Sequence, residues 1–195
     1  MSTAEEPNVD GIRPGPGVDG ESAEDLLRVV AERIRSVPDH PQPGVLFRDI
    51  TPVLADGEAL ATVAAELAAR TGQAELVAGV EARGFLFGAA AAVVAGIGTV
   101  PVRKEGKLPV VAASRSYDLE YGSATLELPA GIVEPGTPVY VVDDVLATGG
   151  TAAATCALLT EAGAEIVGFG TLLEITALRG RDALDGIRVD ALLSA

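Results

Sequence analysis

The sequence predicts an α/β protein with an open parallel sheet flanked by helices. Short apolar runs alternate with helical stretches between residues 75 and 175, which is the pattern of a parallel sheet. The chain has 195 residues, 48% of them hydrophobic, so it can bury one sizeable core. Together these observations favour a single folded domain.

The N-terminal elements are the least regular part of this pattern. Residues 1–21 mix Pro, Gly and acidic residues without a hydrophobic period, so we expect a disordered acidic tail ahead of one domain over residues 22–195. A first helix should begin at Ser22, where Ser-Ala-Glu-Asp resembles a capping box. The Pro-rich stretch 38–44 then interrupts the chain, and a second helix is expected over residues 58–70.

The regular α/β repeat follows these helices. We expect helices over residues 84–95 and 150–162, and parallel strands over residues 75–80, 99–103, 138–144 and 165–175. Between the second and third strands the repeat is interrupted by a loop and by a hairpin strand at 124–133. We expect residues 105–117 of this interruption to form a mobile lid, because they follow a strand end and contain Gly106 and Pro109.

The composition of the chain limits the classes of partner and the cellular compartment that we expect for this protein. The formal net charge is −14 and no basic run offsets it, so we expect no nucleic-acid partner. The longest apolar run, residues 89–95, is too short to cross a bilayer, so we expect no membrane insertion. Cys156 is the only cysteine, which excludes an intrachain disulfide and fits the reducing cytoplasm.

The carboxyl ends of the predicted strands carry the charged residues. The first strand ends in "EARG" (81–84), the second in "RKEGK" (103–107) and the third in Asp143-Asp144. Ligands of open parallel sheets bind beyond these ends, so cations from two strands should face carboxylates from a third.

The stretch "VVDDVLATGGTAA" (141–153) predicts a phosphate site. Gly149 and Gly150 let the backbone approach a ligand, and Thr148 and Thr151 add hydroxyl donors at the start of a helix with free N–H groups. The motif is neither a nucleoside-triphosphatase loop nor a dinucleotide fingerprint, because it lacks both glycine patterns.

The adjacent carboxylates narrow the ligand to a sugar phosphate. Asp143 and Asp144 would repel a phosphate unless they accepted hydrogen bonds from hydroxyl groups of the same ligand, as ribose hydroxyls would allow. The alternative is that both are ordinary turn residues and that the glycines only shape the loop.

Four stretches together resemble a known family. The motif "VVDDVLATGGTAAA" resembles the phosphoribosyl-pyrophosphate signature of type I phosphoribosyltransferases. Three further stretches look like adenine phosphoribosyltransferases, in the same order: "PDHPQPGVLFRDITPVLAD" (38–56), "VEARGFLFGAAAA" (80–92) and "VRKEGKLP…SYDLEYG" (102–122). The resemblance implies transfer of ribose 5-phosphate from phosphoribosyl pyrophosphate to adenine, giving AMP and pyrophosphate in purine salvage.

The resemblance also implies a small N-terminal hood that binds the base, a flexible active-site loop, and residue roles. Ala147 and the four residues after it (Thr148, Gly149, Gly150, Thr151) would bind the 5-phosphate. Glu120 would approach N7 of the purine as a general acid, although it also reads as a strand-surface carboxylate. The base would contact Leu46, Phe47, Arg48 and Val145, although Phe47 by itself is equally a core residue.

The basic residues near the second strand are candidates for pyrophosphate binding. Lys104 and Lys107 are the only lysines of the chain and lie beside Arg103. A lysine is a compact charge suited to phosphate oxygens, so we expect pyrophosphate contacts from these three and from Arg83. The alternatives are a solvated lysine face and an ion pair of Arg83 with Glu81.

The resemblance has further implications for cofactor and assembly. Mg²⁺ would be carried by the substrate pyrophosphate, with no dedicated metal site in the protein. We expect a homodimer, because the family is dimeric and the helix at 84–95 is apolar around much of its surface. A cis peptide is expected at Ala82–Arg83.

Two other functions stay open at this stage. A phosphoribosyltransferase for a 6-oxo base would need a donor such as lysine after the last strand, where "TLLEITAL" (171–178) has none. A regulator that senses phosphoribosyl pyrophosphate would need a nucleic-acid-binding surface, which the basic residues do not supply.

Overall fold

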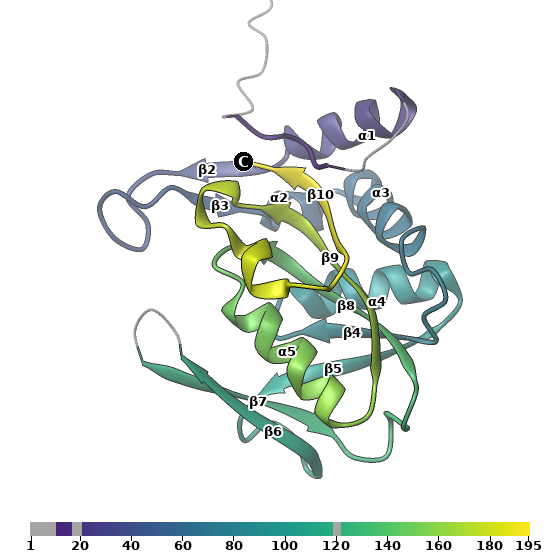
Figure 1. The fold of residues 1–195 in the computed structure, drawn as a ribbon. Helices are drawn as coiled ribbons and strands as arrows, with labels where there is room; N and C mark the ends of the chain where they lie inside the picture. The colour runs from purple at the N-terminus through teal and green to yellow at the C-terminus, as the bar shows by residue number, and fades with distance from the viewer. Residues whose placement is uncertain (1–10, 17–20, 119–121) are drawn as a thin grey trace, which may run out of the picture.

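The structure is a computed structural model that describes residues 11–16, 21–118 and 122–195 (Figure 1). Within these residues an eight-stranded sheet has the order β1-β10-β9-β8-β4-β5-β7-β6. From one edge to the other its strands are β1 Arg13–Pro14, β10 Val189–Ser194, β9 Glu165–Glu174, β8 Pro138–Leu146, β4 Leu76–Val80, β5 Gly98–Lys104, β7 Ser123–Pro129 and β6 Val111–Asp118.

The central five strands, from β10 to β5, are parallel. The outer strands β1, β7 and β6 join the sheet antiparallel. Because the carboxyl ends of the parallel strands meet at one edge, this topology brings the charged strand ends together as the sequence predicted. The open α/β sheet is therefore confirmed.

Helices cover both faces of the sheet (Figure 1). They are α1 Glu21–Ala31, α2 Thr51–Ala55, α3 Gly57–Ala68, α4 Gly84–Ala95 and α5 Gly150–Glu161. The first four pack in one buried cluster with Tyr140 and Val142 of β8, whereas α5 packs in a second cluster with Val139 and Val141. This alternation along β8 reflects the two-residue period of a strand, and it fixes the face to which each residue before Asp143 points.

A separate ribbon forms the hood. Strands β2 Arg35–Val37 and β3 Phe47–Asp49 pair antiparallel with each other and stand apart from the main sheet. Arg35 pairs with Asp49 across the ribbon, with 2.5 Å between Nη2 and Oδ2. Asp49 also accepts from the Thr51 N–H at 2.9 Å, so the ribbon runs directly into α2.

The N-terminal prediction is wrong for residues 11–16. Arg13 and Pro14 pair with Ser194 and Leu193 of β10, and Ile12 is buried, inside the range expected to be a disordered tail. The reason is that β10 would otherwise be an open edge whose backbone groups need partners. Of the other residues of the expected tail, the structure describes only Glu21, which begins α1.

Two further expectations differ from the structure. Residues 105–117 were expected to be a loop, but β6 begins at Val111 and pairs with β7, because its side chains alternate between the core and solvent. The cis peptide lies at Glu81–Ala82, one residue before the expected position.

In the described part of the chain, no helix has the length and apolar character needed to cross a membrane.

Candidate active site

Three adjoining pockets lie at the carboxyl ends of β4, β5 and β8. The loop pocket, of about 90 Å³, is lined by Asp143 and residues 145–152. The central pocket, of about 370 Å³, shares Asp143 and Thr151 with it. The hood pocket, of about 310 Å³, shares Arg83 and Asp144 with the central pocket. The three pockets therefore lie next to one another and share walls at this edge of the sheet.

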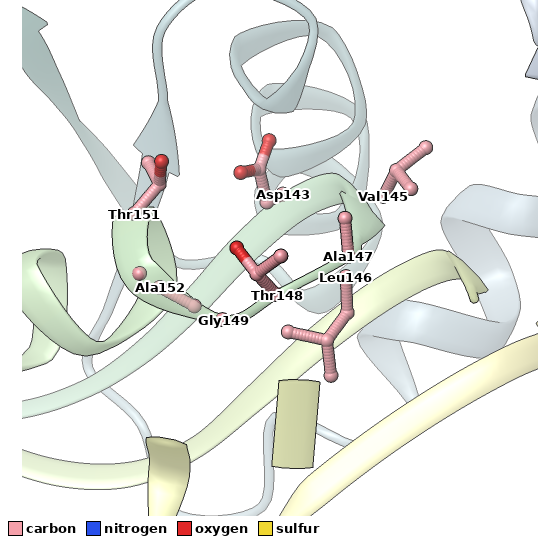
Figure 2. A pocket seen from close by; sticks show the side chains of 9 residues that line it. Asp143, Val145, Leu146, Ala147, Thr148, Gly149, Thr151 and Ala152 are labelled. Atoms are coloured by element: carbon pink, nitrogen blue, oxygen red, sulfur yellow. The ribbon is translucent and has the colours of Figure 1, made fainter. Parts of the chain in front are cut away.

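The loop pocket is built where β8 turns into α5. Gly149 caps the helix with φ of 85°, a left-handed conformation that suits glycine. Figure 2 shows the side chains of Asp143, Thr148 and Thr151 around this pocket. The first N–H groups of α5 have no acceptor within the helix, and the helix dipole adds positive potential there. The pocket thus suits an anion such as a phosphate.

Asp143 and Asp144 are neighbours in the chain, and Asp143 lines the loop and central pockets whereas Asp144 lines the central and hood pockets. The Asp144 backbone N–H donates to Asp143 Oδ1 at 2.8 Å. Burial, followed by the charge of Asp144, raises the pKa of Asp143 well above its ordinary value, while Arg83 opposes the shift. Asp143 is therefore costly to keep ionised unless a ligand donates hydrogen bonds to it.

Arg83 connects this acidic pair with the hood. Its Nη2 lies 2.8 Å from Asp144 Oδ2, and its guanidinium lies 5.9 Å from the centre of the Phe47 ring. The expected alternative, an ion pair with Glu81, does not occur among the described contacts of Arg83. Asp144 Oδ2 is buried and, within the described residues, accepts no hydrogen bond besides this ion contact. The guanidinium of Arg83 therefore balances the charge of this buried oxygen.

The three other residues expected to bind pyrophosphate, Arg103, Lys104 and Lys107, lie at different places relative to the pockets. Lys104 lines the central pocket, whereas Arg103 and Lys107 do not line any of the three pockets. Arg103 Nε lies 3.3 Å from Glu81 Oε2, and the Lys104 N–H donates to the same oxygen at 2.8 Å. Although burial works against ionisation, these two contacts lower the pKa of Glu81. Lys107 is exposed in the turn after β5.

The hood pocket contains every residue expected to contact a base. Its lining is mainly apolar and includes Leu46, Phe47, Arg48 and Val145. The Phe47 ring meets His40 edge-on, with 5.0 Å between the ring centres. Arg48 donates to the Ser36 hydroxyl on the neighbouring strand. A flat aromatic ligand would fit between the ring of Phe47 and the side chain of Val145.

Several lining residues were not predicted as site residues. Tyr117, Ala124 and Leu126 line the central pocket, and Ile175 lines the hood pocket. Tyr117 belongs to the "SYDLEYG" stretch, which resembles the family, but the resemblance did not indicate that its side chain lines this pocket. Glu120, the expected general acid, lies outside the described residues.

The described residues hold no group of three or more His, Cys, Asp or Glu side chains that could bind a metal ion. The carboxylates that line the central pocket are those of Asp143, Asp144 and Glu81. Carboxylates suit Mg²⁺, but an ion here would need most of its ligands from a substrate or from water.

Comparison with known proteins gives consistent matches. Residues 53–190 match the family model described as phosphoribosyl transferase domain. The chain is 56% identical to an adenine phosphoribosyltransferase of Saccharopolyspora erythraea, over 87% of this chain and 92% of that protein. It is 54% identical to one from Mycolicibacterium gilvum, over 90% of this chain and 98% of that protein.

Solved structures agree with the sequence matches. A crystal structure of adenine phosphoribosyltransferase from Thermoanaerobacter pseudethanolicus has a TM-score of 0.82 at 43% identity, covering 87% of this chain and 99% of that one. The Saccharomyces cerevisiae enzyme, solved with an imino-altritol bisphosphate and adenine, has a TM-score of 0.82 at 31% identity, covering 86% and 98%. The chain therefore belongs to the phosphoribosyltransferase family, among the adenine phosphoribosyltransferases.

Proposed function

We propose that this protein transfers ribose 5-phosphate from phosphoribosyl pyrophosphate to adenine, forming AMP and pyrophosphate for purine salvage. The observation that carries the proposal is the row of three adjoining pockets, in which an anion pocket, an acidic pair and an apolar slot follow one another. This order matches the phosphate, ribose and base of the product.

Each part of the substrate has a proposed set of contacts. The 5-phosphate would bind residues 147–151, and the ribose hydroxyls would donate to Asp143 and Asp144. Adenine would lie in the hood pocket against Leu46, Phe47, Arg48 and Val145. Pyrophosphate would occupy the central pocket, with Arg83 and Lys104 beside it. Arg103 and Lys107 would approach from the adjoining strand end and turn.

The proposed chemistry is displacement at C1 of the ribose. The bond between C1 and the pyrophosphate oxygen breaks as adenine N9 bonds to C1, and the leaving group takes the electron pair. Positive charge develops on the sugar beside Asp143 and Asp144, which stabilise it, while Arg83 and Lys104 offset the charge of pyrophosphate. Adenine loses a proton as N9 bonds to C1, and Glu120 would accept that proton from N7 and return it as a general acid in the reverse reaction.

Mg²⁺ would accompany the pyrophosphate. When bound, it would neutralise part of the leaving-group charge, as Mg²⁺ commonly does on substrate phosphates. Asp143 and Asp144 provide the hard oxygen donors on this side of the central pocket.

We further propose that the protein is a cytoplasmic homodimer. On α4 the side chains of Leu86, Val93 and Val94 are 54%, 80% and 57% exposed. Exposed apolar groups gathered on one helix are typical of a protein interface.

A nucleobase panel tests the function. The protein is incubated with phosphoribosyl pyrophosphate, Mg²⁺ and adenine, hypoxanthine or guanine, and nucleotide formation is measured. We expect AMP from adenine and little product from the 6-oxo bases. Equal turnover of hypoxanthine or guanine would contradict adenine specificity. Absence of any nucleotide, with intact binding of phosphoribosyl pyrophosphate, would favour a sensing role instead.

A further inference from the structure

Strand β6 lies along helix α5 and contacts both of its ends. Ala113, Arg115 and Tyr117 are the less exposed residues of β6, so the strand's two-residue period turns them toward the helix. Arg115 pairs with Glu161 in the last turn of α5. Tyr117 contacts Thr151 in the first turn, with 3.1 Å between the two hydroxyl oxygens. One side chain of β6 therefore reaches the helix start that forms the loop pocket.

Thr151, in the first turn of α5, differs from three threonines that lie farther along their helices. Thr62, Thr155 and Thr160 each donate to the carbonyl oxygen four residues earlier, at 3.0, 2.8 and 2.9 Å. For Thr151, the hydrogen-bond partner found among the described residues is Tyr117, which comes from another element. The hydroxyl of Thr151 is thus oriented by β6 rather than by its own helix.

The chemistry of the two hydroxyls indicates the direction of the hydrogen bond. A phenol is a stronger donor than an aliphatic alcohol, and a threonine hydroxyl has one proton and two lone pairs. When Tyr117 donates to Thr151 Oγ1, the threonine keeps its own proton for a second partner. Thr151 lines both the loop pocket and the central pocket, so that proton is available to a ligand between them.

We propose that Tyr117 is a positioning residue for the 5-phosphate. Its hydroxyl donates to Thr151 Oγ1 and thereby directs the single Thr151 proton toward a phosphate oxygen, which can only accept. Hydrogen bonds in such a chain strengthen one another. This inference rests on the proposed function, because it takes the loop pocket as the 5-phosphate site.

The variant Tyr117→Phe tests the inference with the least disturbance. It removes one oxygen and keeps the ring, which packs against the buried cluster around α5. Binding of ribose 5-phosphate, measured by calorimetry, should weaken about two- to tenfold, the range of one neutral hydrogen bond. The KM for phosphoribosyl pyrophosphate should rise by a similar factor, while the KM for adenine stays unchanged.

A double-mutant cycle separates positioning from packing. Thr151→Val should also weaken ribose 5-phosphate binding, and Tyr117→Phe added to it should cause no further loss, because the hydroxyl pair acts as a unit. The matched control is Arg115→Met, which removes the ion pair of β6 with the other end of α5. It should bind ribose 5-phosphate as the parent protein does.

The outcomes distinguish the inference from the proposed function. If Thr151→Val weakens binding but Tyr117→Phe does not, Tyr117 has no positioning role and the phosphate site stands. Additive losses, or an equal loss in Arg115→Met, would show that Tyr117 acts only through docking of β6. Unchanged binding in Thr151→Val would overturn both the 5-phosphate assignment and the inference.

Discussion

Gly149 and Gly180 pack against each other behind the loop pocket. A Cβ atom on Gly149 would lie 2.3 Å from the Gly180 carbonyl oxygen, and one on Gly180 would lie 2.3 Å from the Ala147 carbonyl oxygen. Gly180 begins a short 3₁₀ helix, Gly180–Leu184, that follows β9. The backbone of the proposed phosphate site is thus supported by a segment about thirty residues later in the chain.

The first prediction concerns this contact. Gly180→Ala should displace the loop and destabilise the fold by about 1–3 kcal/mol, the usual cost of overpacking. Thermal unfolding should show the loss, and ribose 5-phosphate binding should weaken with it. Gly57→Ala is the control, because a Cβ there meets nothing within 4 Å. Parent-like binding by Gly180→Ala would show that the loop does not depend on this support.

A second prediction concerns the acidic pair and pH. Burial raises the folded-state pKa of Asp143 well above its ordinary value, so the folded state favours the neutral carboxyl. The free protein should therefore lose stability as the pH rises from the unfolded-state value through the raised value. Asp143→Asn stays neutral, and its Tm should exceed that of the parent at pH 7.5, with the difference vanishing near pH 3.

The same variant should lose function. An amide oxygen can still accept the Asp144 N–H, but it cannot supply the charge that a developing cationic sugar requires. Turnover should fall by at least about tenfold, since a charge-assisted hydrogen bond is lost. If Asp143→Asn is no more stable than the parent protein at neutral pH, the assigned environment of Asp143 is wrong. If the variant is also fully active, the assigned role is wrong as well.

Arg83 should affect two substrates at once. It lines the central and hood pockets, and it contacts both Asp144 and the Phe47 ring. Arg83→Lys keeps a charge but loses the planar fork, so the KM values for phosphoribosyl pyrophosphate and for adenine should both rise. Steady-state kinetics with each substrate varied in turn provide the test. A change confined to one KM would show that Arg83 serves only one pocket.

The turn between β5 and β6 should be the site of ligand-dependent proteolysis. Lys107 is exposed there, whereas Arg115 lies within β6 and is paired with Glu161. Trypsin should cut after Lys107 faster than after Arg115, and phosphoribosyl pyrophosphate with Mg²⁺ should slow the first cut. Lys107→Ala should lower turnover more than it weakens adenine binding. Cutting that ligand leaves unchanged would argue against closure of this turn.

The helix α4 should form the dimer interface. Val93→Glu places a charge on the most exposed apolar side chain of α4, at 80% exposure, and should give a monomer in sedimentation. Ile132→Glu, at a half-exposed position outside α4, is the control and should remain dimeric. A parent protein that sediments as a monomer would refute the proposed assembly.

Local patterns predicted the central fold well. The bounds of α4 agree with the expected range at both ends, because the helix is preceded by a strand end and followed by Gly96 in a left-handed conformation. The Asp143-Asp144 pair and the glycine turn were also placed correctly at the end of β8. These features depend on neighbouring residues, so the sequence carries them directly.

Features that depend on distant partners were missed. The pairing of Arg13 with β10, the strand character of β6 and the support from Gly180 each need a partner from elsewhere in the chain. Arg103 is a further example. Its side chain contacts Glu81, which follows the neighbouring strand β4. The spacing of residues along the sequence does not show which basic side chain will pair with a carboxylate from a neighbouring strand.

The hood has a consequence for how such enzymes diversify. Because β2 and β3 form a ribbon that shares no strand pairing with the main sheet, the proposed base contacts of Phe47 and Arg48 stand on a separate scaffold, and β8 adds Val145 to the same pocket. Substitutions in the ribbon can accumulate without altering the register of β8, which carries the acidic pair. A change of base preference can therefore begin in the ribbon while the backbone of the phosphate loop stays in place.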